Sequence, residues 1–505
     1  MGITNRLAQI MTVQPDAEAI AQDDRWDSWR DVDAVGRAIE EHLRDLPAGA
    51  AVGLISRNRV GVVSALLGLL ARRRAVVTLN HVQPDSALAA EIQQLRPAVL
   101  VAAEEDWQRP GVEPAARSAG TLGLVVERGP AAGARVVHRP VEGPASDCFR
   151  AGDDCAIVLK TSGTTGPPKR VELTYRSLSA SIAAVQKHHG AKDAHEVRLR
   201  PGVTIQMLPL AHTSAIQSVC TTVADGRRLI LLDRFEPHAW ARAVRDYQVV
   251  TTGIPPAAIK MVLDSDIDPE WLSSLKAVRA GSAPLDPLVA EAFTARFGIP
   301  VLQAYGATEF QGLASWTLKD HRRFATAKKG AVGRIHPGVE VRVVDPETEQ
   351  VLPVGSAGIL EVRTAQSSTG PGEWVRTSDL ARYDEDGFLW ILGRVDGAIN
   401  RGGFKIQPDE VAKVLREHPD VADAAVVGAP DHRLGEVPVA CVELRPGAAD
   451  PGEDALRAWV RGHLEAYKVP TRIRAVAMLP RTIALKPDKQ AILQLVGADD
   501  ALAEA

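Results

Sequence analysis

The chain has 505 residues, 45% of them hydrophobic and 24% charged, and its formal net charge is −4. This length exceeds one ordinary hydrophobic core, so we expect two or more domains. The weak negative charge, and the lack of any run near the ~20 apolar residues of a membrane helix, argue against a nucleic-acid-binding or membrane-spanning protein.

The first hundred residues alternate between helical and strand patterns. Apolar residues at helical spacing predict amphipathic helices, and short apolar runs predict buried strands. In chain order the predicted elements are a helix (27–43), a strand (51–55), a helix (60–70), a strand (76–79), a helix (88–95) and a strand (98–102). This alternation is typical of an α/β unit with a parallel sheet.

Residues 127–147 are rich in Gly, Pro and Ala, and we expect an irregular connection there. Strand and helix patterns then resume. They predict strands at 156–159, 205–208, 229–232, 249–252 and 301–303, and helices at 174–187 and 237–246. The α/β arrangement is therefore expected to continue to about residue 330.

The pattern changes after about residue 330. Short strands with turn residues predict a small β-barrel-like subdomain, and a compact α+β unit follows it. The strands are expected at 340–344, 358–362 and 388–391, and the helices of the last unit at 409–417 and 454–464.

Four cysteines are spread along the chain, at Cys148, Cys155, Cys220 and Cys441. They form no C-x-x-C pair and no His/Cys cluster with the spacing of a zinc site. Scattered thiols of this kind fit a reducing compartment, and the N-terminus lacks the long apolar stretch of a signal peptide. We therefore predict a cytoplasmic protein.

A short apolar strand runs directly into a loop made of hydroxyl residues and glycines. Gly163 and Gly166 let the backbone N–H groups turn inward, as a phosphate-binding loop requires. The loop also carries four hydroxyl donors and one cation, from Thr161, Ser162, Thr164, Thr165 and Lys169. Its glycine spacing differs from that of a P-loop, so a kinase or GTPase loop is a poor match.

Two further segments carry groups suited to a nucleotide. Tyr305 offers an aromatic face to a purine, Thr308 offers a hydroxyl to a phosphate, and Glu309 is a carboxylate suited to Mg²⁺. Asp379 follows Thr377 and Ser378, and its carboxylate is a good acceptor for the two hydroxyls of a ribose. Each segment alone is equally compatible with an ordinary turn or strand end.

Together, six segments in this order resemble the motifs of the adenylate-forming superfamily, which includes acyl-CoA synthetases, luciferase-like enzymes and peptide-synthetase adenylation domains. The segments are 161–169, 303–309, 374–379, 393–396, 401–408 and 480–486. The resemblance extends over nearly the whole chain, and it implies an α/β fold with a large N-terminal domain (1–395, the β-barrel-like subdomain being about 330–395) and a small mobile C-terminal domain (396–505).

The resemblance also implies two half-reactions. ATP and a carboxylic acid would give an acyl-adenylate and pyrophosphate with Mg²⁺ held by Glu309, and CoA would then displace AMP. Lys486, Thr308, Glu309 and His212 would be the catalytic residues. ATP and AMP would be bound by Thr161, Ser162, Gly163, Thr164, Thr165, Gly166, Lys169, Gly281, Ser282, Ala283, Pro284, Tyr305, Gly306, Asp379 and Arg394.

For the second half-reaction the resemblance assigns a hinge and a CoA loop. Asp396 would be the hinge about which the C-terminal domain rotates. Arg401, Gly402, Gly403 and Lys405 would bind CoA, because a glycine pair lets a narrow pantetheine chain pass close to the backbone. Carrier-protein-loading domains commonly lack the second glycine, so Gly403 favours free CoA.

Two positions depart from the family pattern. Leu485 stands before the adenylation lysine, where the family usually has glycine, and Ser282 replaces the second residue of a common Gly-Gly-Ala. Spacing from Pro480 favours Lys486 as the adenylation lysine, but Lys489 is close enough to remain an alternative.

The resemblance places the acyl pocket after the Pro-Leu segment at 209–210. Its walls would be His212, Thr213, Ser214, Gly253, Ile254, Ala280 and Ala307. These residues are mostly small and apolar, which favours a bulky apolar acid that is aromatic, alicyclic or of medium chain length. No residue matches the Asp with which peptide-synthetase domains bind an amino group.

Three functions remain open from the sequence. The first is an AMP-forming acid–CoA ligase, an acid–thiol ligase. The second is an acyl-AMP ligase that loads a separate carrier protein or another nucleophile in natural-product biosynthesis. The third is a non-catalytic nucleotide-binding member, for which the unusual segment Leu485-Lys486-Pro487 is the only support. The sequence leaves the acid and the choice between monomer and homodimer open.

Overall fold

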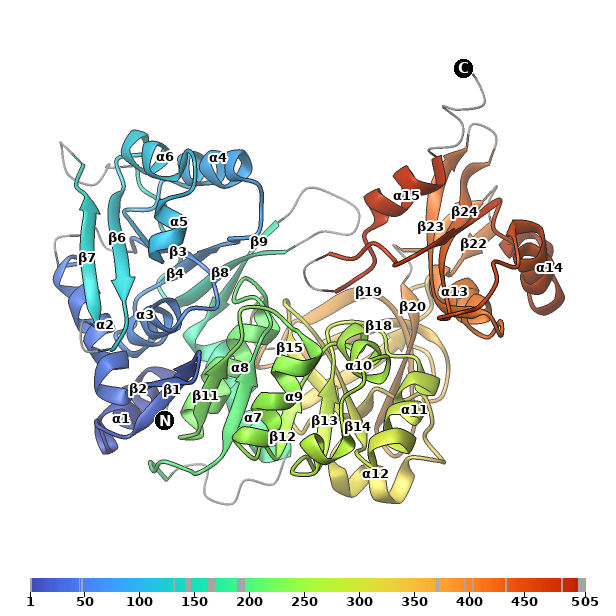
Figure 1. Cartoon of the computed structure of the whole chain (residues 1–505), viewed down its shortest axis with the longest axis horizontal. Helices are drawn as coiled ribbons and strands as arrows, with labels where there is room; N and C mark the ends of the chain where they lie inside the picture. Colours follow the sequence, from blue (N-terminus) through green and yellow to red (C-terminus); the bar gives the residue numbers. More distant parts are fainter. Residues whose placement is uncertain are drawn as a thin grey trace.

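The computed structural model describes residues 2–44, 46, 49–129, 132–140, 147–161, 169–188, 196–368, 370, 372–394, 397–401, 404–431, 434–482 and 485–497. The strands in these residues form four sheets. Figure 1 shows the chain as an N-terminal block, a middle block and a C-terminal block, coloured blue to cyan, green to yellow, and orange to red. Of the helices in the described part, none is long and apolar enough to cross a membrane.

The N-terminal block is built on a seven-stranded sheet with the order β7-β6-β5-β3-β4-β8-β9. Its central strands are parallel and buried along their length, as the short apolar runs predict. The strands are β3 (Val52–Ile55), β4 (Val76–Leu79), β5 (Val99–Ala102), β6 (Leu122–Glu127), β7 (Gly133–His138), β8 (Cys155–Thr161) and β9 (Lys169–Thr174). The helices are α1 (Ile3–Val13), α2 (Trp29–Glu41), α3 (Val60–Ala71), α4 (Asp85–Leu95), α5 (Glu104–Trp107), α6 (Val112–Ser118) and α7 (Tyr175–His188).

The irregular connection predicted for residues 127–147 is wrong in part, because it contains β7. This strand pairs antiparallel with β6 at the edge of the sheet, and most of its residues are only half-buried. An edge strand needs apolar residues on one face alone. Two valines among glycines and alanines were too weak a signal to predict it.

A second, four-stranded sheet joins distant parts of the chain in the order β10-β11-β1-β2. Its strands are β1 (Glu18–Gln22), β2 (Arg25–Ser28), β10 (Val203–Gln206) and β11 (Arg228–Leu231). Helices α8 (Thr213–Ala224) and α9 (Pro237–Asp246) follow β10 and β11. The carboxyl end of β10 therefore leads, through the Pro-Leu segment, to the start of α8.

The third sheet has nine strands in the order β12-β13-β14-β15-β16-β20-β19-β18-β17. Its first three strands are parallel and the others antiparallel, so the strands expected in a β-barrel-like subdomain continue the same sheet. The strands are β12 (Thr251–Gly253), β13 (Ala277–Ala280), β14 (Val301–Ala307), β15 (Gln311–Ser315), β16 (Gly333–Ile335), β17 (Val339–Val344), β18 (Gly358–Thr364), β19 (Trp374–Tyr383) and β20 (Phe388–Arg394). Its helices are α10 (Pro256–Leu263), η2 (Pro269–Leu272), α11 (Pro287–Phe297) and α12 (Leu318–Phe324).

The C-terminal block has its own sheet and its own apolar core. Three antiparallel strands and a hairpin partner are joined by β25, which runs parallel to β24. The elements are β21 (Ile399–Arg401), β22 (Phe404–Ile406), α13 (Pro408–Arg416), β23 (Val421–Asp431), β24 (Gly435–Leu444), α14 (Glu453–His463), η3 (Ala466–Lys468), β25 (Arg472–Val476) and α15 (Lys489–Gly497).

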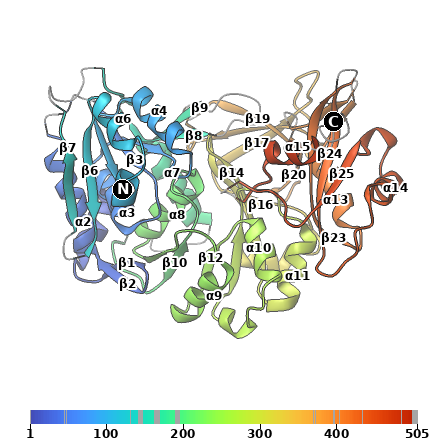
Figure 2. The same cartoon turned by 45° about the horizontal axis from the view of Figure 1, so that its top comes forward.

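The C-terminal block is docked on the middle block (Figure 2). Arg416 of α13 lies 3.2 Å from the carboxylate of Asp286, and Lys260 lies 3.6 Å from that of Glu443. Leu485 packs on the apolar core that includes Ala280 and Leu285. These contacts bring the segment around residue 485 to the carboxyl ends of β13 and β14.

Candidate active site

The site begins at the N-terminus of α8. His212 is the residue before the helix, and Thr213 is its first residue. The Thr213 hydroxyl donates a hydrogen bond of 2.9 Å to the hydroxyl of Thr308. The unpaired N–H groups of a helix start favour an anion nearby, so this end of α8 suits a carboxylate or phosphate.

Thr308 and Glu309 lie in the tight turn between β14 and β15. The turn is fixed by Ser368, whose backbone N–H and hydroxyl both donate to the Glu309 carbonyl oxygen, at 2.9 and 3.1 Å. Gly306 must be a glycine, because a Cβ there would lie 2.1 Å from the Gln311 carbonyl oxygen. The close approach of the two strands therefore sets where the Thr308 and Glu309 side chains emerge.

A second cluster joins β14 to β19 and β20. The Tyr305 hydroxyl donates a hydrogen bond to the Asp379 carboxylate. Burial, and then the negative charge of Asp379, raise the pKa of Tyr305 well above its usual range, so the phenol keeps its proton. Arg394, opposite Asp379 on β20, lies 3.6 Å from the same carboxylate. Asp379 is thus poised between two donors, which ribose hydroxyls would replace or join.

Lys486 reaches the same place from the C-terminal block. It lies next to Pro487, which forms a β-bridge with Arg481. The Thr482 N–H donates to the Lys486 carbonyl oxygen at 2.7 Å. The Arg481 guanidinium also donates to the Leu485 carbonyl oxygen at 3.0 Å. The carbonyl groups of Leu485 and Lys486 are therefore both fixed by hydrogen bonds.

The charges around Lys486 show which groups face it. Loss of surrounding water, and then the positive charge of Arg394, lower the pKa of Lys486. Burial, and then Lys486 itself, lower the pKa of His212. The Lys486 side chain is nevertheless exposed, so a ligand can reach it. One ammonium group therefore lies near the start of α8 and near Arg394, where an anion would be stabilised.

Both departures from the family pattern have a left-handed backbone. Leu485 has a φ of 58° and Ser282 a φ of 69°. Glycine reaches this region without strain, which explains why the family usually has glycine at both positions. The chain keeps the backbone conformation while changing the residue, and Leu485 gains apolar packing on the middle block.

The base of the phosphate loop is fixed by Glu91 of α4. Its carboxylate lies 3.2 Å from Lys160 and 2.9 Å from Arg170, which face each other on β8 and β9. Lys169 begins β9 and is exposed. Ser162, Gly163, Thr164, Thr165 and Gly166 lie outside the described residues, and Thr161 is described for its backbone alone.

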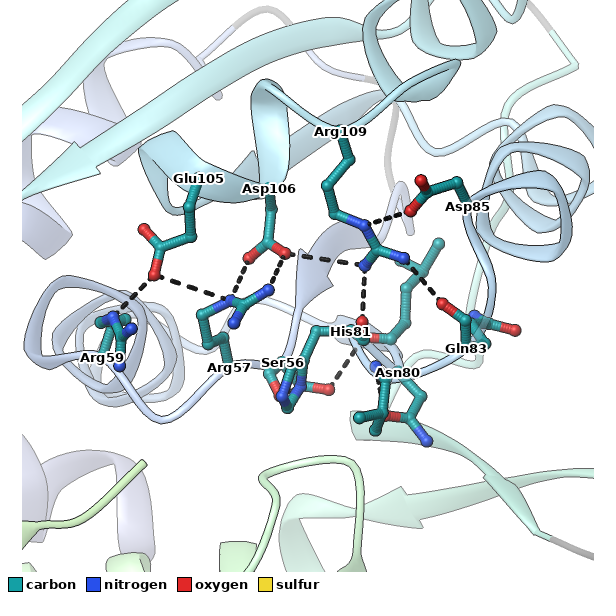
Figure 3. Close-up of polar contacts among 12 residues, drawn as sticks. Ser56, Arg57, Arg59, Asn80, His81, Gln83, Asp85, Glu105, Asp106 and Arg109 are labelled. Atoms are coloured by element: carbon teal, nitrogen blue, oxygen red, sulfur yellow. Dashed lines mark hydrogen bonds and ion pairs between the residues drawn. The ribbon is translucent and has the colours of Figure 1, made fainter. Parts of the chain in front are cut away.

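Figure 3 shows a network that continues from this base across the carboxyl ends of β3, β4 and β5. The Gln83 side chain donates to Glu91 at 2.7 Å, and Arg109 donates to the Gln83 carbonyl oxygen at 2.7 Å. Arg57 makes a two-pronged contact with the fully buried Asp106, at 2.9 and 2.7 Å. Sequence reasoning missed this network, because its residues are far apart in the chain and lie in the loops after β3 and β4 and in or beside α4 and α5.

Glu309 is the predicted Mg²⁺ ligand. In the described part of the chain no group of three or more His, Cys, Asp or Glu could hold a metal. Mg²⁺ often binds through one or two carboxylates together with substrate phosphates. Glu309 beside Thr308 fits that kind of site, in which the nucleotide brings most of the ligands.

Of the residues predicted to bind CoA, the structure describes the side chain of Arg401 alone. The Arg401 side chain donates to the Tyr467 carbonyl oxygen at 2.6 Å, within the C-terminal block. Asp396, Gly402 and Gly403 lie outside the described residues, and Lys405 is described for its backbone alone. Lys489, the alternative lysine, begins α15.

The residues predicted for the acyl pocket come from α8 and from strand ends. His212, Thr213 and Ser214 lie at the start of α8, and Gly253, Ala280 and Ala307 end β12, β13 and β14. Ile254 follows Gly253 and is buried in the neighbouring apolar core. Gly281, Ala283 and Pro284 form, with Ser282, the turn after β13. Sequence reasoning missed Arg279, which is paired with Gly253 in the sheet register.

Known protein families match this chain along most of its length. The model described as "AMP-binding enzyme" matches residues 7–370, and "AMP-binding enzyme C-terminal domain" matches residues 410–486. A relative from Oryza sativa subsp. japonica named 4-coumarate–CoA ligase-like 9 is 34% identical over 67% of this chain and 63% of its own length. The peroxisomal OPC-8:0-CoA ligase 1 of Arabidopsis thaliana is 28% identical over 94% of this chain and 88% of its own length.

Solved structures agree with the fold. ATP-bound MatB from Rhodopseudomonas palustris superposes with a TM-score of 0.81 at 25% identity, covering 99% of this chain and 100% of that one. The amide bond synthetase McbA from Marinactinospora thermotolerans gives a TM-score of 0.79 at 26% identity, with coverage of 98% and 100%. The chain therefore belongs to the AMP-binding enzyme family, in the acid–CoA ligase branch of the adenylate-forming superfamily, whose members use ATP, Mg²⁺ and CoA.

Proposed function

We propose that the protein is an AMP-forming acid–CoA ligase. It joins a carboxylic acid to AMP with release of pyrophosphate, and then transfers the acyl group to CoA. The relatives named CoA ligases support this reaction. The observation that carries the proposal is that the charge of Lys486 acts on His212 and the charge of Arg394 acts on Lys486, because these residues supply positive charge where two anions must approach.

The first half-reaction is a problem of charge. The carboxylate and the α-phosphate repel each other, and a carboxylate is a weak nucleophile when it is solvated. Lys486 would contact oxygens of both groups, and the start of α8 would add backbone N–H donors. Mg²⁺, held through Glu309, would neutralise charge on the phosphates. Catalysis would then rest mainly on positioning and electrostatic stabilisation.

The nucleotide would lie across the ends of β13 and β14. Tyr305 and the turn at 281–284 would border the adenine, and Asp379 would accept hydrogen bonds from the ribose. Thr308 would bind the α-phosphate, and the loop from Thr161 to Lys169 would surround the departing pyrophosphate. The Thr213–Thr308 hydrogen bond and the Tyr305–Asp379 hydrogen bond support this assignment, since they hold these side chains close together.

The second half-reaction would need a different orientation of the C-terminal domain. Lys486 and the segment at 401–405 come from the same block, and Lys486 now faces the site while Arg401 is bonded to Tyr467. A rotation about Asp396 would exchange them, so that Arg401, Gly402, Gly403 and Lys405 meet CoA. The division into domains at residue 396 is part of this proposal.

A second acceptor is favoured by one observation. The structural neighbour McbA is named an amide bond synthetase, and its chain matches this one over nearly the full length. Transfer of the acyl group to an amine, or to the thiol of a carrier protein, would use the same adenylate.

The cytoplasmic location also remains a prediction. It rests on four free, buried cysteines, whereas one relative is named as peroxisomal.

The test is pyrophosphate release with Mg-ATP over a panel of carboxylic acids, with and without CoA, together with mass detection of products. Release that increases with CoA, and an acyl-CoA product, are expected. Release without a thioester would move the proposal to an amine or carrier-protein acceptor. Nucleotide binding without pyrophosphate release from any acid would favour the non-catalytic alternative.

A further inference from the structure

Arg279 is a half-buried cation of the middle block. It lies on β13, paired in register with Gly253 on β12 and Leu302 on β14. Its Nε is buried and has no hydrogen-bond partner, and no ion pair involves this side chain among the described residues. Burial, and then the charge of Arg227, lower the pKa of Arg279 to about 10, so it remains charged at neutral pH. Removing a charge from water without a counter-ion costs free energy, so we expect a negatively charged partner for this side chain.

Among the described residues, Asp225 is the carboxylate whose charge acts on Arg279, and it forms no ion pair with this side chain. The charge of Arg279 acts on His188 and His336, whose rings lie 4.3 Å apart between centroids. Burial lowers the pKa of both, that of His336 to about 3, so both are neutral at pH 7. His336 is also tied to the Ser315 hydroxyl at 2.9 Å.

The two acidic residues nearest to this group are already occupied. Asp225 accepts a hydrogen bond of 2.6 Å from Gln186 and lies 3.6 Å from Arg227. Asp320, whose charge acts on His188, lies 3.1 Å from Arg334. Neither carboxylate reaches Arg279 within hydrogen-bond distance. Among the described residues, Arg279 therefore has no carboxylate at ion-pair distance, and the charge of Asp225 acts on it only from further away.

Arg279 lies along the path that leads away from the reacting centre. Thr213 touches Thr308 at the start of α8, and Gln217 is one turn, about 6 Å, further along that helix. A Cβ on Gly312 would lie 3.6 Å from the Gln217 amide and 3.7 Å from the His336 ring. Helix α8, β15 and the His336 ring thus connect the adenylation site to the surroundings of Arg279.

Room for a ligand is left beside Arg279. Its register partner Gly253 is exposed, and a Cβ built there would meet nothing closer than the Arg279 carbonyl oxygen at 3.9 Å. Paired residues of neighbouring strands point to the same face of a sheet. The missing side chain of Gly253 therefore opens space on the face to which the guanidinium belongs.

We propose that the acid carries a second carboxylate at the end remote from the one that is adenylated, and that Arg279 binds this second carboxylate. The inference rests on the proposed function, because it names the substrate class of that site. Arg279 would then be a specificity-determining residue, and the acid, which the mostly small and apolar residues of the predicted pocket suggest to be bulky, would carry a carboxylate at each end. Gln217 and the neutral histidines would add hydrogen bonds around the bound carboxylate.

The experiment compares mono- and dicarboxylic acids of equal carbon number, in straight-chain and aromatic pairs, by pyrophosphate release. We expect the wild type to favour the dicarboxylic member of the best pair by roughly 100-fold in kcat/KM. Arg279→Met should remove that preference and Arg279→Lys should keep part of it. Arg242→Met, at an exposed position of α9, is the matched control and should keep the full preference.

A wild type that uses monocarboxylic acids better than their dicarboxylic partners would overturn the inference while leaving the ligase reaction intact. An Arg279→Met enzyme that is folded by thermal denaturation yet keeps the wild-type preference would overturn it as well. If Arg279→Met does not fold, the comparison of wild type with Arg279→Lys still decides the question. Lack of pyrophosphate release from every acid would count against the proposed function instead.

Discussion

Two regions of the molecule differ in whether their arginine and lysine side chains have a carboxylate at ion-pair distance. In the network of Figure 3, Arg57, Arg59 and Arg109 each lie within 3 Å of a carboxylate of helix α4 or α5. At the candidate site, Lys486 and Arg279 have no carboxylate at ion-pair distance among the described residues. Paired charges hold a structure together, whereas charges left without a counter-ion are available to a ligand.

The largest expected effect comes from removing one carboxylate of the ion-pair network in Figure 3. Asp106→Ala removes a fully buried carboxylate and leaves Arg57 without its main partner. We expect the free energy of unfolding to fall by about 3–5 kcal/mol, measured by urea denaturation. Asp16→Ala, which removes the partner of Arg30 in an exposed pair, should cost far less, because exposed ion pairs contribute little to stability. Equal losses in the two variants would contradict a structural role for the network.

The next effect concerns the region of unpaired charge. Lys486→Ala should lower the rate of pyrophosphate release by roughly 10²–10³, because it removes the charge that two approaching anions need. Thioester formation from supplied acyl-adenylate should change little, and the unfolding midpoint should stay near that of the wild type. Lys489→Ala is the matched control. A large loss in that variant, with normal adenylation by Lys486→Ala, would show that the motif is shifted by three residues.

The pH dependence of adenylation should also show the effect of the charge of Lys486. The pKa of Lys486 is lowered by loss of water and by Arg394, so its charged form is lost at a lower pH than in a free lysine. Adenylation needs the charged form, and kcat/KM for pyrophosphate release should therefore fall by about tenfold per pH unit above that pKa. In Lys486→Arg the remaining activity should not show this decline. An unchanged alkaline decline in that variant would assign it to another group.

The smallest expected effect concerns the backbone beside the site. Ser282 has a left-handed φ of 69°, so Ser282→Gly should relieve strain and raise the free energy of unfolding by up to about 1 kcal/mol. Ser273 is an exposed serine with a φ of −60°. Ser273→Gly should therefore lower stability by about 0.5–1 kcal/mol. Changes of the same sign in both variants would contradict this reading.

Much of the fold was predictable because its strands are short, apolar and buried. The predicted strand at 76–79 and helix at 237–246 agree with β4 and α9 at both ends. The edge strand β7 was missed because half-buried residues carry a weak pattern. The joining of the presumed barrel strands to β12–β14 in one sheet also could not be predicted, because strand pairing over long distances leaves no local signal.

The candidate site divides in the same way. The motifs correctly predicted the family, and residues from different motifs lie together, since Tyr305 donates a hydrogen bond to Asp379 and the charge of Lys486 acts on His212. Arg279 was missed because an arginine next to Val278 looks like any exposed strand residue. Its proposed role depends on the lack of a carboxylate at ion-pair distance. That lack can be seen only when α7, α8 and β13 are packed together in the structure.

The left-handed backbone of Ser282 and Leu485 has a consequence for how related genes are recognised. A signature that demands glycine at either position would reject this chain, although its main chain turns as the family's glycines allow. What matters for the fold at such a position is the backbone torsion angle, and more than one amino acid can adopt that angle. Searches that score the angle rather than the letter would recover members that a strict signature discards.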